Sequence, residues 1–132
     1  MKNKTWSGRF AKAINEDVLD FSQSLTIDIV LYDADIMVTE AHVEMLGRCS
    51  HLKATEVKKI KAGLKKIKKL AHGGELPWSI ELEDVHMNIE HALISEIGEI
   101  GKKIHLGRSR NDLVATDTRV YLRELIDVML QH

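Results

Sequence analysis

The sequence has few of the residues that cross-link or interrupt a chain. The one cysteine, Cys49, excludes an internal disulfide and is compatible with a reducing compartment. No apolar run is long enough to span a bilayer. The segment Met1–Phe10 is polar and basic, and it lacks the apolar stretch of a secretory signal. These absences predict a cytoplasmic protein with no membrane partner.

The sequence also has no excess of charge of either sign. The formal net charge of the 132 residues is −1, which argues against a general nucleic-acid binder. Hydrophobic residues make up 44% of the chain and charged residues 30%, a balance typical of a folded globular domain. A chain of this length accommodates one modest domain.

One local exception is the segment from Lys53 to Lys69, which contains eight lysines. It could be a basic helix that contacts phosphate or a membrane surface. The alternative is the solvated face of an amphipathic helix. Because aromatics are scarce and the apolar positions between the lysines are regular, we favour the solvated face.

The apolar residues recur mostly with helical spacing, which predicts an all-α fold. A short helix is expected at Asn15–Ser24, with Asn15 as its cap, and a long one at Ile27–Arg48. Ile36 and Val43 lie off the main face of this long helix and suggest packing from more than one side. The residues expected to share its main buried face are Val30, Ala34, Met37, Val38, Ala41 and Met45.

Three further helices follow. The first is expected to begin at an N-cap, Thr55, and to stop at Gly73–Gly74. Its apolar face contains Val57, Ile60, Leu64, Ile67 and Leu70. The face of the second contains Val85, Ile89, Ala92, Leu93 and Ile97. The last helix begins near Arg110, and its broad apolar face contains Val114, Ala115, Tyr121, Leu122, Leu125, Ile126 and Met129.

The last helix lacks a stop signal. "LIDVMLQH" contains no Gly, Pro or C-cap residue, and the apolar pattern continues almost to His132. We therefore expect the sequence to end inside a helix that is longer in the parent protein.

Seven histidines raise the possibility of a metal site. His86 and Glu90 are four residues apart on a helix and could share an ion, but no third ligand has zinc-like spacing, so no metal is expected. Asp84, Asn88 and His91 recur at helical spacing on another face. They could form a polar wall of a cleft, although a solvated face is the simpler interpretation.

The segment "HLGRSRND" concentrates polar chemistry at one helix start. Ser109 is a suitable N-cap, and Asp112 falls in the first turn. The free N–H groups of a helix start, with Arg108, Arg110 and Asn111, could bind a carboxylate or phosphate. A well-capped helix with solvated arginines would have the same sequence, so both interpretations stay open here.

Several segments resemble one family. "GRSRND" followed by "VATD" is similar to a signature of the argininosuccinate lyase family, in the fumarase/aspartase superfamily. "WSGRF", "FSQSL", "LEDVHMNIE" and "YLRELI" match further segments in the same order. The departures are Ser7–Gly8 in place of two glycines, and Leu106 and Leu113 in place of residues that are commonly polar.

The resemblance implies an enzyme that cleaves argininosuccinate to arginine and fumarate by β-elimination, in arginine biosynthesis, without metal or organic cofactor. It implies a homotetramer built on a helical bundle. Residues 1–109 would form an N-terminal helical domain and residues 110–132 the start of the bundle. The catalytic histidine and serine would lie beyond His132, so the chain alone is expected to be inactive. The implied substrate-binding residues are Ser24, Asp84, His86, Ser109, Arg110 and Asn111.

Two other functions remain compatible with the sequence. One is a structural member of the same family, as the delta-crystallins are. The other is an unrelated helical interaction module that uses its lysine-rich helix.

Overall fold

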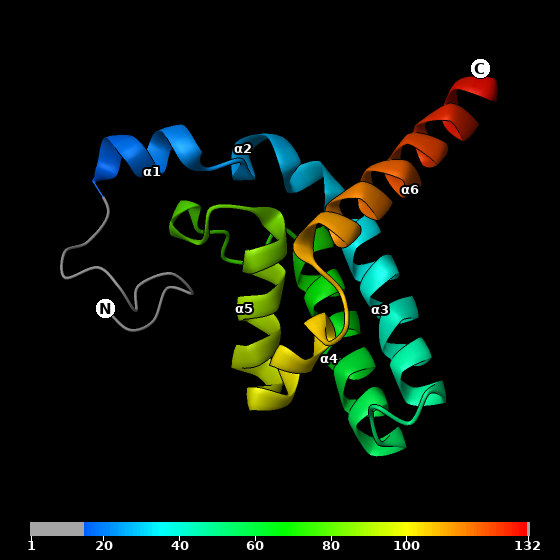
Figure 1. Ribbon diagram of the computed structural model, residues 1–132. Helices are drawn as coiled ribbons and strands as arrows, with labels where there is room; N and C mark the ends of the chain where they lie inside the picture. Colours follow the sequence, from blue (N-terminus) through cyan, green and yellow to red (C-terminus); the bar gives the residue numbers. More distant parts are fainter. Residues whose placement is uncertain (1–14, 132) are drawn as a thin grey trace.

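Helices make up all regular structure in residues 15–131, the part of the chain that this computed structural model describes (Figure 1). The expected all-α class is confirmed. "WSGRF" lies outside the described residues. The elements in order are α1 (Glu16–Ser22), α2 (Leu25–Asp28), the 3₁₀ helix η2 (Ile29–Leu31), α3 (Tyr32–Arg48), α4 (Ala54–His72), η3 (Ile80–Leu82), α5 (Val85–Ile97), η4 (Gly98–His105) and α6 (Arg110–Leu130).

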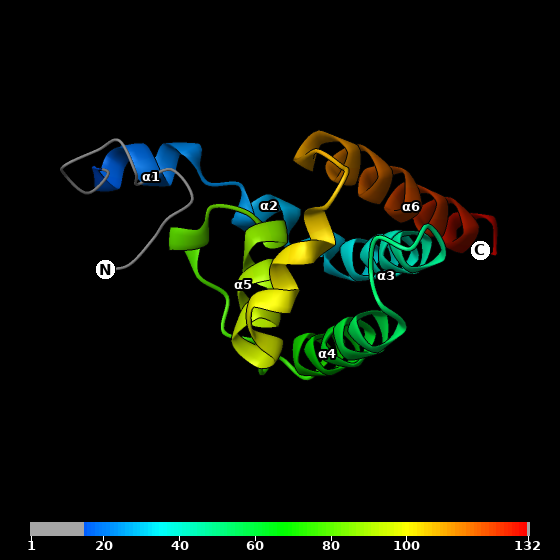
Figure 2. The same cartoon turned by 60° about the horizontal axis from the view of Figure 1, so that its bottom comes forward.

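Three helices form the body of the fold. α3 and α4 run antiparallel, and α5 packs against both, while α6 crosses α3 near its own start and then extends away (Figures 1 and 2). Within the described residues, no helix is long and apolar enough to cross a membrane.

The core lies between these three helices. α4 contributes Ile60, Leu64 and Ile67, all buried, and the predicted apolar face of this helix is confirmed. α5 contributes Val85, Ile89 and Leu93, as expected. Removing such side chains from water is the main favourable term in folding, about 25 cal/mol per Å² of apolar area.

Gly63 sets the distance between α4 and α5. A Cβ built on this residue would lie 2.7 Å from Leu93 Cδ1 and 3.0 Å from Ile97 Cγ2. The two helices are in contact here because Gly63 has no side chain.

The face predicted for the long second helix is wrong for most of its residues, although Ala34 is buried as predicted. Met37 and Met45 are 47% and 42% exposed, whereas Ile36, Val43 and Leu46 are buried. The buried side of α3 also includes Asp35 and Thr39. Apolar spacing missed this side because two of its positions are polar. Ile36 and Val43, noted as lying on another face, are confirmed as packing positions.

The helix ends agree in part with the sequence. Asn15 caps α1 by accepting the N–H of Asp17 at 2.8 Å, as predicted. Gly73 and Gly74 end α4, and Gly74 adopts a φ of +70°. The prediction of Thr55 as a cap is wrong, because α4 begins at Ala54 and Glu56 Oε2 accepts the N–H of Lys53 at 2.9 Å.

The predicted helix at Ile27–Arg48 also begins differently. Residues 25–31 form α2 and η2, and α3 starts only at Tyr32. This tighter segment includes Asp28, whose carboxylate binds Ser24 and the start of α5.

Ion pairs involve several lysines of α4. Lys61 contacts Glu44, Lys66 Nζ lies 2.6 Å from Glu96 Oε2, and Lys68 Nζ lies 3.1 Å from Asp33 Oδ1. This arrangement agrees with a solvated helix face held by neighbouring acids.

We predict that Gly63→Val destabilises the fold by about 2 kcal/mol or more, because the new side chain must displace Leu93 and Ile97 in a packed core. The matched control is Ala62→Val, at the exposed neighbouring position, which should cost only about 0.5 kcal/mol of helix propensity. Urea unfolding followed by circular dichroism measures both. Equal losses in the two variants would contradict the close-contact role of Gly63.

Candidate functional site

The start of α6 is a capping box. Ser109 Oγ accepts the N–H of Asp112 at 3.3 Å, and Asp112 Oδ2 accepts the N–H of Ser109 at 2.9 Å. Gly107 precedes it with a φ of +74°, which glycine adopts at little cost. The predicted cap and helix start are confirmed.

The two arginines of this segment have different partners. Arg110 reaches α5, where its NH2 lies 3.3 Å from Glu90 Oε2 and its NH1 3.6 Å from Asp84 Oδ1. His105 Nε2 contacts the same Glu90 oxygen at 3.0 Å. Burial alone would raise the pKa of Glu90, but His105 and Arg110 lower it below its ordinary value. Glu90 is therefore a carboxylate that holds Arg110 in place.

Ser24 approaches the same end of α5. Its Oγ donates to Asp28 Oδ2 at 2.5 Å, and Asp28 Oδ1 accepts the N–H of Val85 at 3.1 Å. The N–H of Ser24 donates to the carbonyl of Glu83 at 2.8 Å. Asp84 caps α5 by accepting the N–H of Met87 at 2.6 Å. Ser24, Asp84 and Arg110, far apart in sequence, thus meet at the start of α5.

Glu83 adopts an unusual backbone conformation at this meeting point. Its φ is +67° and its ψ −51°, and the N–H of Asp84 donates to the carbonyl of Leu82 at 2.7 Å. Leu82, Glu83 and Asp84 therefore form a tight three-residue turn. Its positive φ costs free energy at Glu83, because this residue has a side chain. Such strain is often found where backbone must present groups to a ligand.

The other predicted site residues differ in exposure. Asn111 is exposed at the start of α6. His86 is buried in the interior, 3% exposed. The structure therefore places His86 behind the groups at the start of α5.

The solvated-face interpretation of α5 is wrong for Asn88. Of the three residues Asp84, Asn88 and His91, which recur on one face of this helix, only His91 is exposed. Asn88 is 4% exposed, accepts the N–H of Ser79 at 2.8 Å, and donates to the carbonyls of Ser79 and Asp84. The amide is buried because it replaces backbone hydrogen bonds in the turn before α5.

A cluster of three buried titratable groups was missed by sequence reasoning. His86 Nδ1 lies 2.6 Å from Asp35 Oδ2 and 3.4 Å from Asp117 Oδ2. We call Asp35, His86 and Asp117 the buried triad. Its members come from α3, α5 and α6. The signal available in the sequence was Asp117 itself, which follows Leu113 by one turn and shares its buried side.

Arg108 joins the triad from the turn before α6. Its NH2 donates to Thr39 Oγ1 at 2.9 Å, and Thr39 Oγ1 donates to Asp35 Oδ1 at 3.2 Å. The guanidinium therefore continues the polar chain from the buried triad to the Gly107 turn.

The pKa values of Asp117 and His86 are both raised. Burial, then the charge of Asp35, raises the pKa of Asp117 to about 7, against the lowering effect of His86 and Arg108. Burial would lower the pKa of His86, but its hydrogen bond to Asp35 and the nearby carboxylates raise it. Asp117 and His86 thus bind protons more tightly than the same groups do in water.

The triad has the side chains of a small metal site, since one ligand atom from each residue falls within 4.8 Å of the others. Two carboxylates and an imidazole suit several divalent ions. However, the adjacent Arg108 guanidinium would repel a metal cation. A proton bound within the triad also offsets the negative charge that such an ion would neutralise.

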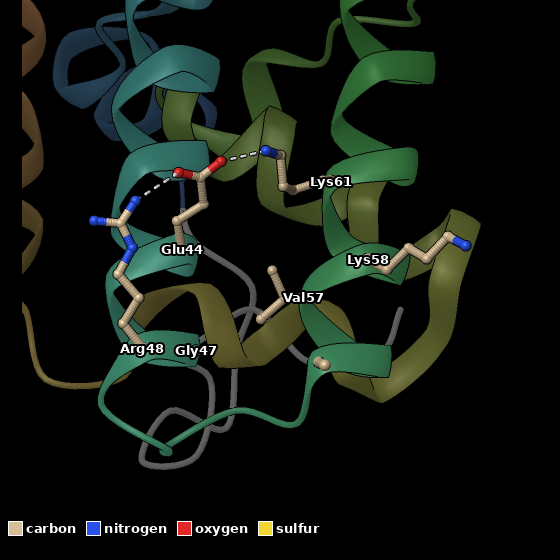
Figure 3. Close-up of a pocket in the computed structure, with 7 residues that line it drawn as sticks. Glu44, Gly47, Arg48, Val57, Lys58 and Lys61 are labelled. Carbon is tan, nitrogen blue, oxygen red and sulfur yellow. Dashed lines mark hydrogen bonds and ion pairs between the residues drawn. The ribbon is translucent and has the colours of Figure 1, made fainter.

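A hollow between α3 and α4 lies apart from the candidate site residues (Figure 3). Glu44 lies between Lys61 and Arg48 there, so the charged groups satisfy one another. The hollow is open and brings together none of the predicted site residues.

The chain is similar to known proteins over almost its whole length. Residues 8–132 match a protein-family model described as "Lyase". The chain is 49% identical over 129 residues to an argininosuccinate lyase of Thioalkalivibrio sulfidiphilus, which covers 98% of this chain and 28% of that protein. It is 48% identical over 127 residues to that of Geobacillus thermodenitrificans, covering 96% and 28%. It is 47% identical over 128 residues to the argininosuccinate lyase of Ectopseudomonas mendocina, an alignment that covers 97% of this chain and 28% of that protein.

We predict that Thr39→Val destabilises the fold by about 1–3 kcal/mol, because the half-buried Arg108 guanidinium loses its acceptor while the side-chain volume hardly changes. Thr55→Val, at an exposed position of α4, is the matched control and should change stability by less than about 0.5 kcal/mol. Thermal unfolding of both variants measures this. A Thr39 variant as stable as the wild type would show that Arg108 is satisfied without the hydroxyl.

Proposed function

The chain belongs to the lyase family that residues 8–132 match, and we propose that it forms the amino-terminal, substrate-binding part of an argininosuccinate lyase. It spans about 28% of the length of the curated relatives named above. The activity proposed is therefore that of a longer enzyme, which cleaves argininosuccinate to arginine and fumarate.

The observation that carries this proposal is the convergence of Ser24, Asp84 and Arg110 at the start of α5. The resemblance implies a substrate contact for each of these residues. Within the fold, Ser24 is hydrogen-bonded to Glu83, the residue before Asp84, and Arg110 lies against Asp84 itself. A set of donors and acceptors held by other parts of the fold is the arrangement that substrate orientation requires.

The chemistry of β-elimination explains the polar start of α6. Removal of the Cβ proton leaves a carbanion-like species whose charge spreads onto a carboxylate. Fixed donors around that carboxylate lower the barrier, because they need no reorganisation when the charge develops. In the proposal, Ser109, Arg110 and Asn111 supply these donors, while Ser24 and Asp84 orient the rest of the substrate.

His86 takes a different part in the proposal. Because it is buried and contacts Asp35, it supports the substrate-binding groups from the interior. The proton-abstracting groups belong to other segments of the longer enzyme. We propose further that this enzyme acts in the cytoplasm, in arginine biosynthesis, and uses no metal or organic cofactor.

Assembly into a homotetramer is also proposed, with α6 as a contact helix. Beyond Tyr121 its apolar side chains are exposed: Leu125 by 41%, Ile126 by 53% and Met129 by 74%. An exposed apolar face of this kind is typical of an interface. A second copy of the chain would cover it with an identical face.

We predict that Arg110→Lys and Asn111→Leu each lower kcat by roughly a hundredfold, because each removes a donor from the developing carboxylate charge. The measurement uses a chimera in which this chain replaces the matching segment of the Thioalkalivibrio sulfidiphilus enzyme. Fumarate release is followed by ultraviolet absorbance. Lysine is not equivalent to arginine here, because it lacks the planar fork.

Arg119→Lys is the matched control, since it makes the same change at an exposed position of α6. It should leave kcat within about twofold. A folded chimera with no activity, or normal turnover in both site variants, would overturn the proposal. Circular dichroism and sedimentation establish folding in every case.

We predict that the chain self-associates through α6, because leaving its apolar face in water costs about 25 cal/mol per Å². Leu125→Glu with Ile126→Glu should shift the protein to monomer in sedimentation velocity experiments. Thr116→Glu adds a charge at an exposed polar position and should not. A wild-type chain that stays monomeric at high concentration would disprove this role of α6.

A further inference from the structure

The buried triad connects three helices with the turn that precedes α6. Asp117 is completely buried, although it lies on the helix that carries the substrate-binding groups at its start. We propose that Asp117 is a positioning residue: acting with its neighbours His86 and Arg108, it fixes the turn before α6 and hence the substrate-binding groups on it. This inference rests on the proposed function.

The path of contacts is continuous. Asp117 Oδ2 faces His86 Nδ1 at 3.4 Å, and the same nitrogen lies 2.6 Å from Asp35 Oδ2. The other oxygen of Asp35 accepts from Thr39, whose hydroxyl accepts from Arg108. Because Arg108 stands between Gly107 and the cap Ser109, fixing its side chain also fixes the backbone that presents Arg110 and Asn111.

The charges that act on Asp117 come from two other helices and one turn. α3 contributes Asp35, α5 contributes His86, and the turn contributes Arg108. Asp84 acts in turn on His86. Arg110 and Asp112 act on Arg108 from the start of α6. With His86 and Arg108 cationic and both aspartates ionised, the charges of the four groups sum to zero.

Asp117 is costly to the fold, which argues for a role beyond stability. Neither of its carboxylate oxygens has a hydrogen-bond partner among the described residues. An apolar side chain of similar size would avoid the loss of hydration. Residues that are unfavourable for folding but favourable for function are common where a site must be held in one geometry.

The direction of the pH effect follows from the raised pKa of Asp117, about 7 against an ordinary 3.8. The folded protein binds this proton more tightly than the unfolded chain. The penalty of the ionised carboxylate is therefore absent below pH 4, grows as the pH rises towards 7, and is complete above it. His86, whose pKa is also raised, adds a stabilisation that is lost as the pH rises through its folded pKa.

The test is Asp117→Asn, which keeps the size and removes the charge. In the 132-residue chain we expect its Tm to exceed that of the wild type by about 3 °C or more at pH 8.5, and the difference to shrink towards pH 5. Asp127→Asn, the same change at an exposed position of α6, should show no such pH dependence.

The second readout reports on the turn itself. We expect hydrogen exchange at the Arg108 guanidinium and the Asn111 amide, followed by NMR, to become about tenfold faster in Asp117→Asn. A merely structural residue would couple higher stability to slower exchange. A variant with both a higher Tm and an unchanged or slower exchange would therefore overturn the inference.

The third readout uses the chimera described above. In Asp117→Asn we expect kcat to fall about tenfold and its pH profile to lose a limb near neutral pH, while folding is retained. Should the unsubstituted chimera be inactive, the proposed function fails, and the exchange measurement still decides the role of Asp117. Should Arg110→Lys lower kcat while Asp117→Asn leaves it unchanged, the inference alone fails.

A metal ion at the triad is the competing outcome. Addition of Zn²⁺ or Mn²⁺ to the wild-type chain should leave the His86 resonances unchanged, because Arg108 already supplies the positive charge. A stoichiometric shift that Asp117→Asn abolishes would overturn the proposal in favour of a metal site.

Discussion

The buried carboxylate of Asp117, on the first turns of α6, is the constraint on which the polar interior of this structure depends. The side chain of Asp117 cannot reach water, so its charge must be met by a proton or by neighbouring cations. His86 and Arg108 are the cations within reach, and Asp35 holds His86 from the other side. Four side chains from three helices and one turn thus depend on one another, because each charge is balanced by its neighbours.

This constraint also orders the candidate site. The turn at Gly107 lets two arginines on either side of the cap Ser109 take different directions. Arg108 enters the core and binds Thr39, whereas Arg110 reaches the carboxylates at α5. One arginine is used to hold the turn, and the other stays about one-third exposed, where a ligand can compete for it. A lysine could not serve either position equally, because its single ammonium lacks the planar fork of donors.

The apolar contacts distribute stability unevenly along the molecule. α3, α4 and α5 enclose the core, and Gly63 lets two of them approach closely. The buried residues of α6 within the described part of the chain, Leu113 and Asp117, lie in its first turns, and its later turns expose their apolar side chains. The helix is therefore anchored at the end that carries the candidate site, and the exposed end offers a surface to another copy.

The sequence by itself determined the helical class, the apolar faces of α4 and α5, and the cap at Ser109, because these depend on spacing and on neighbours within one turn. It also pointed to the segments around Ser24, Asp84 and Arg110. The tertiary structure alone decided that these residues meet, that Asn88 and His86 are buried, and which side of α3 faces the core. The reason is physical: Asp35 and Thr39 are bound by partners 51 and 69 residues away, and no local pattern encodes such partners.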